Sequence, residues 1–384
     1  MKSALLVLAD GTFYQGQALG WEGESIGEVV FNTSMSGYQE ILTDPSYRGQ
    51  LVTMTANHIG NYGCNDLDVE SDRVQVSGLI VREASRRASN YRSTATLDEY
   101  LVANRTVAIA GVDTRAVTRR IREGGATMGA IVHGATAADV PAIVERIRSA
   151  PQYDDQDFVA ATSVREPMRV HLRETGDAYH PHLVELVSQS TAWPAGTESS
   201  PHVVVLDYGV KRSILEQLAS TGVRITLVPH DTTAEGVLAL EPDGIMLSNG
   251  PGDPARLEHQ VAQIRELLGK RPVFGICLGH QLLSQAVGGS TFKLVYGHRG
   301  PNQPVMDRDT GRVEITAQNH GYAVRFDDAA DVEVTHVNLN DQTVEGIRVA
   351  SLNAFSVQHH PEAGPGPHDS VAVFSRFRSM LQAS

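Results

Sequence analysis

From residue 202 onward, apolar and polar residues alternate in a regular pattern of strand-like and helix-like segments. Continuous apolar runs, each long enough for a strand, recur as "HVVVLDYG" (202–209), "VRITLVPH" (223–230), "DGIMLSNGPGDP" (243–254) and "RPVFGIC" (271–277). Between them, apolar residues recur every three or four positions, as in amphipathic helices: "VKRSILEQLAST" (210–221) and "LEHQVAQIRELLGK" (257–270). Strands that are apolar on both faces and alternate with helices are typical of a parallel sheet covered on both sides. The pattern predicts an α/β fold with a mostly parallel sheet and right-handed crossovers.

The first half of the chain has a less regular pattern. Short β-like runs alternate with Gly, Asn and Asp turns, and the opening "MKSALLVLAD" ends at the turn signal Asp10-Gly11, which predicts a hairpin's first strand. Two helices are predicted near "TLDEYLVAN" (96–104) and "DTRAVTRRIREGG" (113–125). Residues 312–358 are predicted to be β-rich and antiparallel.

These changes of pattern predict the domain organisation. Residues 1–150 form a smaller mixed α/β domain, and residues 202–384 form the domain with the parallel sheet. Between them, residues 151–201 are polar, and we interpret them as an irregular connector that contains the linker "VSQSTAWPAGTESSPH" (187–202).

Composition narrows the class of protein. A length of 384 residues suits two or three domains, and a net charge of −13 argues against non-specific binding to nucleic acid. No apolar stretch reaches about 18 residues, so no membrane span is expected. Two cysteines cannot form a disulfide framework, which favours a reducing, cytoplasmic compartment.

One cysteine lies in a distinctive setting. "FGICLGHQ" places Cys277 between an apolar strand and a helix, with Gly275 and Gly279 two residues to either side. This is the G-x-nucleophile-x-G elbow, in which small residues allow a sharp turn and the helix N-terminus favours the thiolate. The N–H of Leu278 then points to where an oxyanion would form. The alternative is a buried structural cysteine.

A thiol nucleophile needs a base, and "VQHHPEA" provides the best candidate. In an extended segment, His360 and Glu362 project to one face, while His359 faces the other way. A carboxylate beside an imidazole orients it and stabilises its protonated form. His280 lies on the same element as Cys277 and is expected to point away. A solvated His/Glu pair, or a metal cluster with His368, is the alternative interpretation.

Three other stretches could carry chemistry. The loop "SNGPGDP" (248–254) lacks a phosphate-binding G-K-[ST], so its glycines are more typical of close backbone approach to a ligand, with Gly252 as a second oxyanion donor. Cys64 has no elbow, and we interpret it as a spectator. The arginine-rich stretch "VREASRRASNYR" (81–92) is more typical of a solvated or interface surface than of an anion site.

Taken together, "GICLGHQ", "SNGPGDP" and "HPE" resemble the motifs of class I, triad-type glutamine amidotransferases, over roughly residues 202–380. The first half resembles the small, glutaminase subunit of carbamoyl-phosphate synthetase, in the stretches "FNTSMSGYQEILTDPSYRGQLV" (31–52), "HIGNYG" (58–63) and "GVDTRAVTRRIREGG" (111–125). The combined resemblance covers nearly the whole chain.

The resemblance implies a reaction and a site. Cys277 attacks the amide carbon of glutamine to form a thioester and release ammonia, His360 moves the protons, and Glu362 orients His360. Residues at matching motif positions are implied to hold glutamine: Ser46, Gly250, Gly252, Leu278, Gln281, Asn319, Gly321 and Tyr322. Tyr322 replaces a frequent phenylalanine, His320 is implied to lie near the site, and His359 introduces a second imidazole beside His360.

The resemblance also implies a partner. Ammonia passes to a separate large subunit that carries ATP and Mg and makes carbamoyl phosphate for arginine and pyrimidine synthesis. This chain itself is expected to hold no cofactor and no metal. The alternatives are a glutaminase for another synthase, a free-standing cysteine amidase, or an inactive regulatory subunit, and the intact Cys277, His360 and Glu362 set argues against the last.

Overall fold

The apolar runs after residue 202 are the central strands of one large sheet in a computed structural model that describes residues 2–177, 180–327 and 331–381. Five neighbouring strands run parallel to one another, in the order β13-β12-β14-β15-β20. Their bounds are Arg224–Pro229, His202–Asp207, Gly244–Leu247, Val273–Ile276 and Ala354–Val357. The predicted parallel sheet is confirmed.

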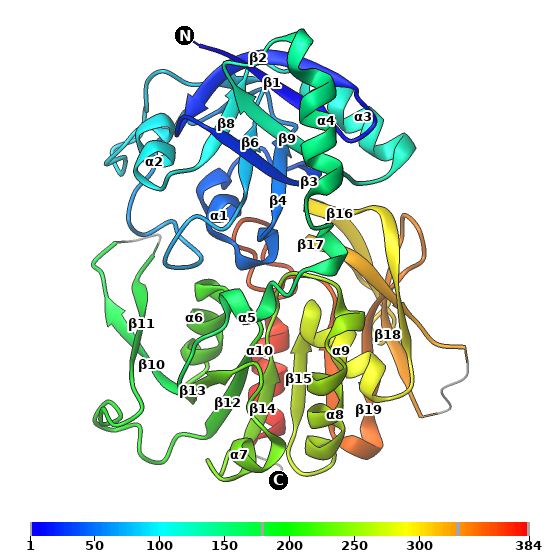
Figure 1. Cartoon of the computed structure of the whole chain (residues 1–384). Helices are drawn as coiled ribbons and strands as arrows, with labels where there is room; N and C mark the ends of the chain where they lie inside the picture. The colour runs from blue at the N-terminus through cyan, green and yellow to red at the C-terminus, as the bar shows by residue number, and fades with distance from the viewer. Residues whose placement is uncertain (1, 178–179, 328–330, 382–384) are drawn as a thin grey trace. The chain divides into compact units, whose positions relative to one another are not determined.

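Helices cover both faces of this sheet (Figure 1). Alternate residues of β12 face opposite sides: Val203 and Val205 pack in one apolar cluster, and Val204 and Leu206 pack in another. The first cluster includes α6 (Arg212–Ser220) and α10 (Ala372–Met380), and the second includes α7 (Ala234–Leu238), α8 (Glu258–Leu267) and α9 (Leu278–Ala286). Because both faces are buried, these strands are apolar throughout.

The polar segment before residue 201 contributes a hairpin to one edge of the sheet, so the expected irregular connector is wrong for this part. Strands β10 (Met168–Glu174) and β11 (His182–Ser188) pair antiparallel, and β10 pairs with β13. Met168, Val170 and Leu172 alternate with polar residues, which is the period-2 signal of a strand with one buried face. This short alternation was masked by the polar residues around it.

The other edge of the sheet is antiparallel, as predicted for residues 312–358, with one correction. Strands β16 to β19 lie beyond β20, with bounds Ser290–Asp307, Val313–Arg325, Glu333–Asn338 and Val344–Val349. Strand β20 pairs antiparallel with β19 but parallel with β15, so it joins the two parts of the sheet. The residues of a strand do not encode the direction of its neighbours, so the pattern could not predict this.

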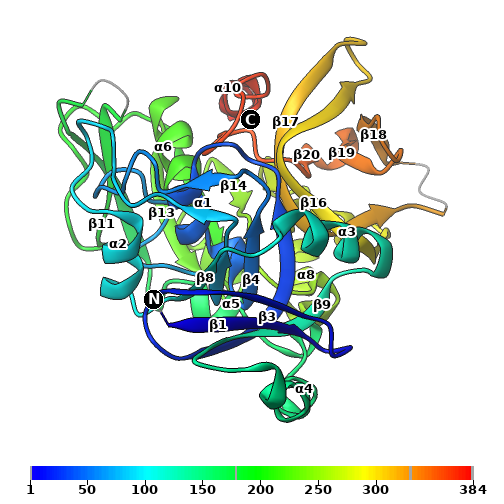
Figure 2. The same ribbon diagram turned by 90° about the horizontal axis from the view of Figure 1, so that it is seen from above.

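The N-terminal unit is a closed barrel with the strand order β1-β2-β8-β6-β4-β3-β9. Figure 2 labels β1, β3, β4, β8 and β9 of this barrel. The bounds of these strands are Ser3–Leu8, Phe13–Gly20, Val107–Ala110, Gly78–Ile80, Gln50–Met54, Glu24–Asn32 and Thr127–His133. The predicted opening hairpin is confirmed, since β1 and β2 pair antiparallel.

Four helices belong to this barrel unit within the described residues. The two predicted ones are α2 (Leu97–Ala103) and α3 (Thr114–Gly124), and the prediction missed α1 (Tyr38–Thr43) and α4 (Val140–Ser149). Helix α4 buries positions 140, 143, 144 and 147 against the barrel strands β1 and β9. That spacing is a readable helical signal, whereas α1 is too short to show one.

The chain divides into these two units at an unexpected place. The N-terminal unit comprises the chain up to Gln156 together with Val295–Gly300, and the C-terminal unit comprises Asp157–Leu294 and the chain from Pro301. The middle of strand β16 therefore belongs to the barrel unit, while its two ends belong to the sheet unit. Among the described residues, no helix combines the length and the apolar character that a bilayer crossing requires.

Candidate active site

Cys277 occupies a strained turn between a strand and a helix. Strand β15 ends at Ile276, helix α9 begins at Leu278, and Cys277 between them has φ 53° and ψ −101°. A non-glycine residue with positive φ is uncommon, and such strain is concentrated at functional sites. The turn is therefore the sharp strand-to-helix elbow that the sequence predicted.

The glycines of the elbow are required by close backbone contacts. A Cβ on Gly279 would lie 2.2 Å from the carbonyl oxygen of Leu247, and one on Gly275 would lie 2.7 Å from the carbonyl oxygen of Gly279. The N–H of Gly279 donates to the carbonyl of Ser248 at 3.0 Å. The helix thus packs directly on the loop after β14, and only glycine fits at both positions.

The structure brings His360 and Glu362 together with Cys277. His360 Nδ1 lies 2.8 Å from Glu362 Oε1, and Cys277 is close enough to the ring to raise the pKa of His360. The N–H of His360 donates to the carbonyl of Ala317 at 2.8 Å, which fixes the backbone beside β17. All three side chains are almost fully buried. The three side chains therefore lie in the order that a nucleophile, a base and an orienting carboxylate would have in triad chemistry, and their roles stay a prediction.

The charges of this group favour a protonated His360. Burial alone would lower its pKa, but the carboxylate of Glu362, together with the neighbouring Cys277, outweighs burial and raises the pKa to about 10. Burial would raise the pKa of Glu362, but Lys211 and His360 hold it well below its usual range. The geometry therefore stabilises an imidazolium beside a carboxylate, which is the charge state that a general acid needs.

Lys211 is a functional neighbour that the sequence analysis missed. Its Nζ donates to Glu362 Oε1 at 2.8 Å and to the carbonyl of Gly364 at 2.7 Å, and its side chain is 4% exposed. A buried ammonium needs such partners, because an unpaired charge in the interior is costly. The signal was present: Lys211 follows the turn after β12, at the carboxyl edge where ligands of parallel sheets bind.

Backbone donors for an oxyanion lie beside the elbow. Leu278 is the first residue of α9, so its N–H has no partner within the helix. A Cβ on Gly250 would lie 2.8 Å from Leu278 Cδ2 and 2.2 Å from the carbonyl oxygen of Tyr208, so the 249–252 loop packs against the elbow. Gly252 has φ 93°, a conformation that favours glycine. The placement of Gly250 and Leu278 fits their predicted role, which stays a prediction.

Strand β17 brings the other predicted glutamine-binding residues of this unit next to Cys277. The thiol donates to the carbonyl oxygen of Asn319 at 3.7 Å, and Gln281 Nε2 donates to the carbonyl oxygen of Tyr322 at 2.9 Å. Gly321 lies between these two positions on the strand. His320 lies 2.8 Å from the same Tyr322 carbonyl through Nδ1. Tyr322 thus contacts Gln281 through its backbone carbonyl, and the roles of these residues in glutamine binding stay predictions.

Ser46 belongs to the N-terminal unit. It lies in the short turn Pro45–Tyr47, where its N–H donates to Asp44 Oδ1 at 2.9 Å, and it is 6% exposed. Its part in glutamine binding stays a prediction.

Two further histidines close to Cys277 and His360 in the sequence, His280 and His359, are buried and contact other residues. His280 is fully buried on α9, and its Nδ1 lies 2.8 Å from Ser356 Oγ on β20. His359 is also fully buried and packs against His336 of β18, with 5.8 Å between ring centroids. Burial, followed by the nearby His336, lowers the pKa of His280 to about 3, and burial with neighbouring imidazoles lowers that of His359 well below its usual value. Both rings are therefore neutral at pH 7.

These neutral histidines predict that the C-terminal unit loses stability in mild acid. Because the pKa of His280 is lowered in the folded state, its contribution is fully present above about pH 6.5 and is lost as the pH falls towards 3. Each pH unit in this window costs about 1.4 kcal/mol, so His280 alone lowers the free energy of unfolding by about 2 kcal/mol between pH 6.5 and pH 5.

The measurement is urea unfolding at about pH 7.5 and pH 5, followed by tryptophan fluorescence. The chain has two tryptophans, so Trp21→Phe leaves Trp193 as a reporter of the C-terminal unit. His280→Gln can retain the Ser356 hydrogen bond without titrating and should reduce the acid loss by about 2 kcal/mol. Equal stability at both pH values would contradict this prediction.

Two alternative candidates do not join the site. Cys64 is fully buried in the N-terminal unit, and burial, followed by the charges of Glu40 and Asp68, raises its pKa to about 12, which suits an inert thiol. His368, considered above as part of a metal cluster, is exposed.

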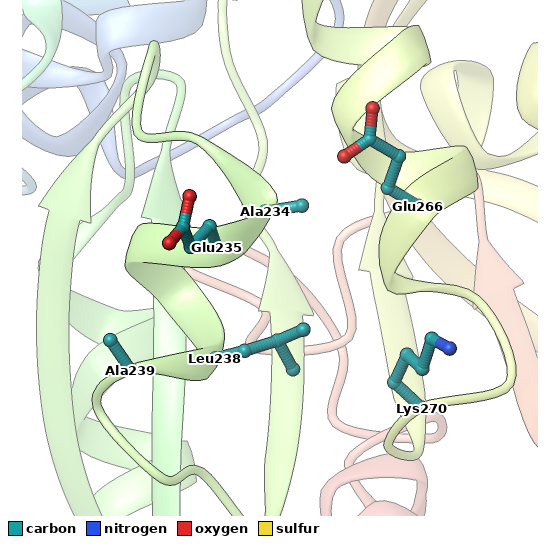
Figure 3. Close-up of a pocket in the computed structure, with 6 residues that line it drawn as sticks. All are labelled: Ala234, Glu235, Leu238, Ala239, Glu266 and Lys270. Carbon is teal, nitrogen blue, oxygen red and sulfur yellow. The ribbon is translucent and has the colours of Figure 1, made fainter.

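The pocket drawn in Figure 3, of about 640 Å³, also lies away from Cys277. It opens between α7 and α8 and is lined by Ala234, Glu235, Leu238, Ala239, Glu266 and Lys270. Lys270 precedes β15, whereas Cys277 follows it, so the pocket lies near the amino ends of the strands. Ligands of parallel sheets gather at the opposite, carboxyl edge.

Comparison with known protein families agrees with this arrangement. Residues 204–380 match the family model "Glutamine amidotransferase class-I". The C-terminal unit, with its parallel sheet, cysteine elbow and adjacent His-Glu pair, is thus a class I glutamine amidotransferase domain. Residues 6–131 match "Carbamoyl-phosphate synthase small chain, CPSase domain".

Full-length relatives identify the family more narrowly. Carbamoyl phosphate synthase small chains from Rhodopirellula baltica and Syntrophotalea carbinolica are both 51% identical to this chain over 99% of its length, and cover 96% and 98% of their own. The small chain from Aquifex aeolicus is 47% identical, with 99% of both chains covered. The chain belongs to the carbamoyl phosphate synthase small chain family, which confirms the resemblance found in the sequence.

Proposed function

We propose that this chain is the glutaminase subunit of a carbamoyl phosphate synthase and hydrolyses L-glutamine to glutamate and ammonia through a thioester on Cys277. The observation that carries the proposal is the Cys277–His360–Glu362 group at a cysteine elbow, in a chain of this family. The thiolate attacks the amide carbon, and the C–N bond breaks as His360 donates a proton to the leaving nitrogen. Water activated by His360 then cleaves the thioester and restores the thiol.

The surrounding residues support each step in this proposal. The N–H groups of Leu278 and Gly252 stabilise the oxyanion of the tetrahedral intermediates. Glu362 holds the imidazolium, and Lys211 holds Glu362. Glutamine is held by Ser46, Gly250, Gln281, Asn319, Gly321 and Tyr322.

The proposal includes a partner. Ammonia passes to a larger, ATP- and Mg-dependent chain that makes carbamoyl phosphate, and the two chains work together in the cytoplasm. Support comes from the name "small chain" carried by the relatives, which implies a larger companion. This chain itself needs no cofactor for the chemistry above, because a thiol, an imidazole and a carboxylate complete the reaction.

The thioester can be trapped directly. The chain, purified with the large chain of the same organism, is mixed with labelled glutamine and quenched in acid, and its peptides are analysed by mass spectrometry. We expect a γ-glutamyl group on the peptide that contains Cys277, and γ-glutamyl hydroxamate when hydroxylamine replaces the acid. A label on Cys64, or none, would overturn the mechanism, and failure of the two chains to co-purify would overturn the proposed partner.

A further inference from the structure

A loop of the N-terminal unit presents an exposed aromatic residue among arginines. We call residues 85–92 the Arg-Tyr loop. Tyr91 is 83% exposed, and Arg86 and Arg87 are also exposed. The sequence analysis left this arginine-rich stretch as either a solvated or an interface surface, and the role proposed for the C-terminal unit does not use it.

The backbone of the Arg-Tyr loop is fixed at both ends. Directly before it, the strand β7 (Glu83–Ala84) pairs with β5 (His58–Ile59), and the N–H of Ser85 donates to the carbonyl of Ile59 at 2.8 Å. The N–H of Ser89 donates to the carbonyl of Asn61 at 2.8 Å. The first half of the loop therefore follows the 58–61 segment closely.

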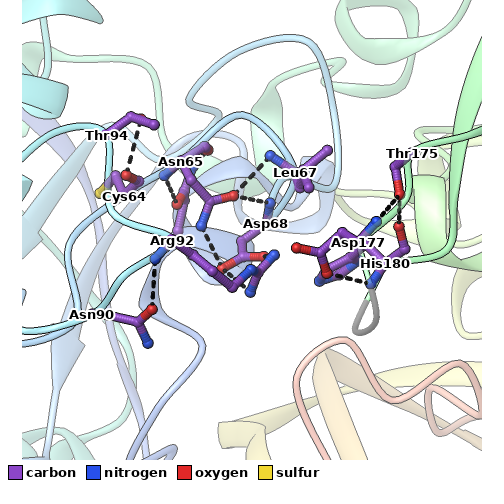
Figure 4. Close-up of polar contacts among 11 residues, drawn as sticks. Cys64, Asn65, Leu67, Asp68, Asn90, Arg92, Thr94, Thr175, Asp177 and His180 are labelled. Carbon is purple, nitrogen blue, oxygen red and sulfur yellow. Dashed lines mark hydrogen bonds and ion pairs between the residues drawn. The ribbon is translucent and has the colours of Figure 1, made fainter.

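The second half of the loop is held by an ion pair, shown in Figure 4. Arg92 Nη2 donates to Asp68 Oδ1 at 2.7 Å, both side chains are largely buried, and the N–H of Arg92 donates to Asn90 Oδ1 at 2.9 Å. Gly63 lies close to the loop, since a Cβ there would be 2.9 Å from Ala88 Cβ and 2.7 Å from Cβ of Ser93, the residue directly after the loop. The loop is therefore held to the 59–68 segment by contacts on both sides of Tyr91.

The exposed side of the Arg-Tyr loop is positively charged, whereas the chain as a whole is negatively charged. The chain has a net charge of −13, yet neither Arg86 nor Arg87 forms an ion pair with any residue that the structure describes. Nearby, the carboxylate of Glu83 is paired with His58, with 3.6 Å between Glu83 Oε2 and His58 Nδ1. The exposed side of the loop is thus locally basic and suits a partner surface that carries carboxylates.

We propose that the Arg-Tyr loop is a docking surface for an acidic patch on the larger synthase chain, with Tyr91 as its apolar anchor and Arg86 and Arg87 as its charged rim. Tyrosine and arginine dominate the binding energy of protein interfaces, and a rigid loop binds without paying to become ordered. The chain's negative charge disfavours nucleic acid as the occupant. The inference rests on the proposed function, because that function supplies the partner.

The test uses the full chain and the purified large chain of the same organism. Binding is measured by surface plasmon resonance at about 50 and 200 mM NaCl for the wild type, Tyr91→Ala and the double variant Arg86→Glu/Arg87→Glu. The matched controls are Met35→Ala, which truncates another exposed apolar side chain, and Arg115→Glu, which reverses an exposed charge on α3. Circular dichroism and thermal melting confirm that every variant is folded.

We expect each loop variant to weaken binding by about 30-fold or more, and the charge-reversal variant to lose most of the salt dependence. The Arg115→Glu control should stay within about threefold of the wild type. If the wild type binds the large chain and both loop variants bind equally well, the docking surface is wrong while the proposed function stands. If the wild type does not bind the large chain at all, the proposed partner itself is wrong. Binding of the wild-type loop to RNA or to a second copy of this chain, lost in the same variants, would also overturn the inference.

Discussion

Cys277→Ser should abolish glutamine-dependent carbamoyl phosphate synthesis by the complex and leave ammonia-dependent synthesis within about twofold of the wild type. The hydroxyl lacks the thiolate that His360 stabilises, so glutamine hydrolysis should fall by about 10³-fold or more. Ammonia supplied from solution bypasses this step, because in the function we propose the larger chain carries out the chemistry that uses ammonia. The measurement compares carbamoyl phosphate formed from glutamine and from ammonium chloride at the same concentration of complex.

The second cysteine of the chain provides the control. Cys64 is as fully buried as Cys277, but burial and the carboxylates of Glu40 and Asp68 raise its pKa, so Cys64→Ser should retain both activities. If the Cys277 variant lost both activities together, or neither, then Cys277 would not be the nucleophile. A melting curve within a few degrees of the wild type shows that the loss is chemical.

Lys211→Met should have the second-largest effect, on both stability and activity. The change leaves the buried Glu362 without its ammonium partner, and breaking a buried ion pair costs about 3–5 kcal/mol. Without Lys211, the pKa of Glu362 should rise, because the cation that lowers it is gone. A protonated Glu362 no longer stabilises the imidazolium of His360, so we expect glutamine hydrolysis to fall by about 10²-fold or more.

A pH profile separates this positioning role from a purely structural one. The acid limb of kcat/KM for glutamine should move to higher pH in Lys211→Met, since Glu362 then titrates at higher pH. Lys270→Met removes an exposed lysine of the same unit and should change neither stability nor the profile. An unshifted acid limb in a folded Lys211 variant would show that Lys211 only supports the fold.

Local patterns predicted the elbow around Cys277 because its geometry is local. The elbow needs a strand, a cysteine between two close glycines, and a helix, all within "FGICLGHQ". His360 and Glu362 meet because they are only two residues apart. The structure joins them by a turn, in which the N–H of Ala363 donates to the carbonyl of His360 at 3.3 Å, so the predicted extended segment is wrong at this point. Burial on both faces made the parallel strands readable as apolar runs.

Features that depend on distant segments escaped prediction. Lys211 gains its role only where the fold brings it to Glu362 and Gly364, some 150 residues further along the chain. The barrel closes through pairings such as β1 with β9, whose residues carry no local mark of the partner. The β10–β11 hairpin was missed because its partly buried alternation is diluted by charged residues.

The path of strand β16 limits how this protein can be cut, permuted or recombined. Its middle residues complete the barrel unit: Tyr296 stacks on Phe31 at 5.9 Å between ring centroids, and the N–H of Ala126 donates to the carbonyl of Val295 at 2.9 Å. A fragment that stops at Gln156 would lack these partners and expose the Phe31 ring. The amidotransferase fragment, in turn, would carry an orphaned Tyr296. The polypeptide thus passes between the two units after Gln156 and again within β16. Either unit produced alone would need substitutions at this strand to fold stably.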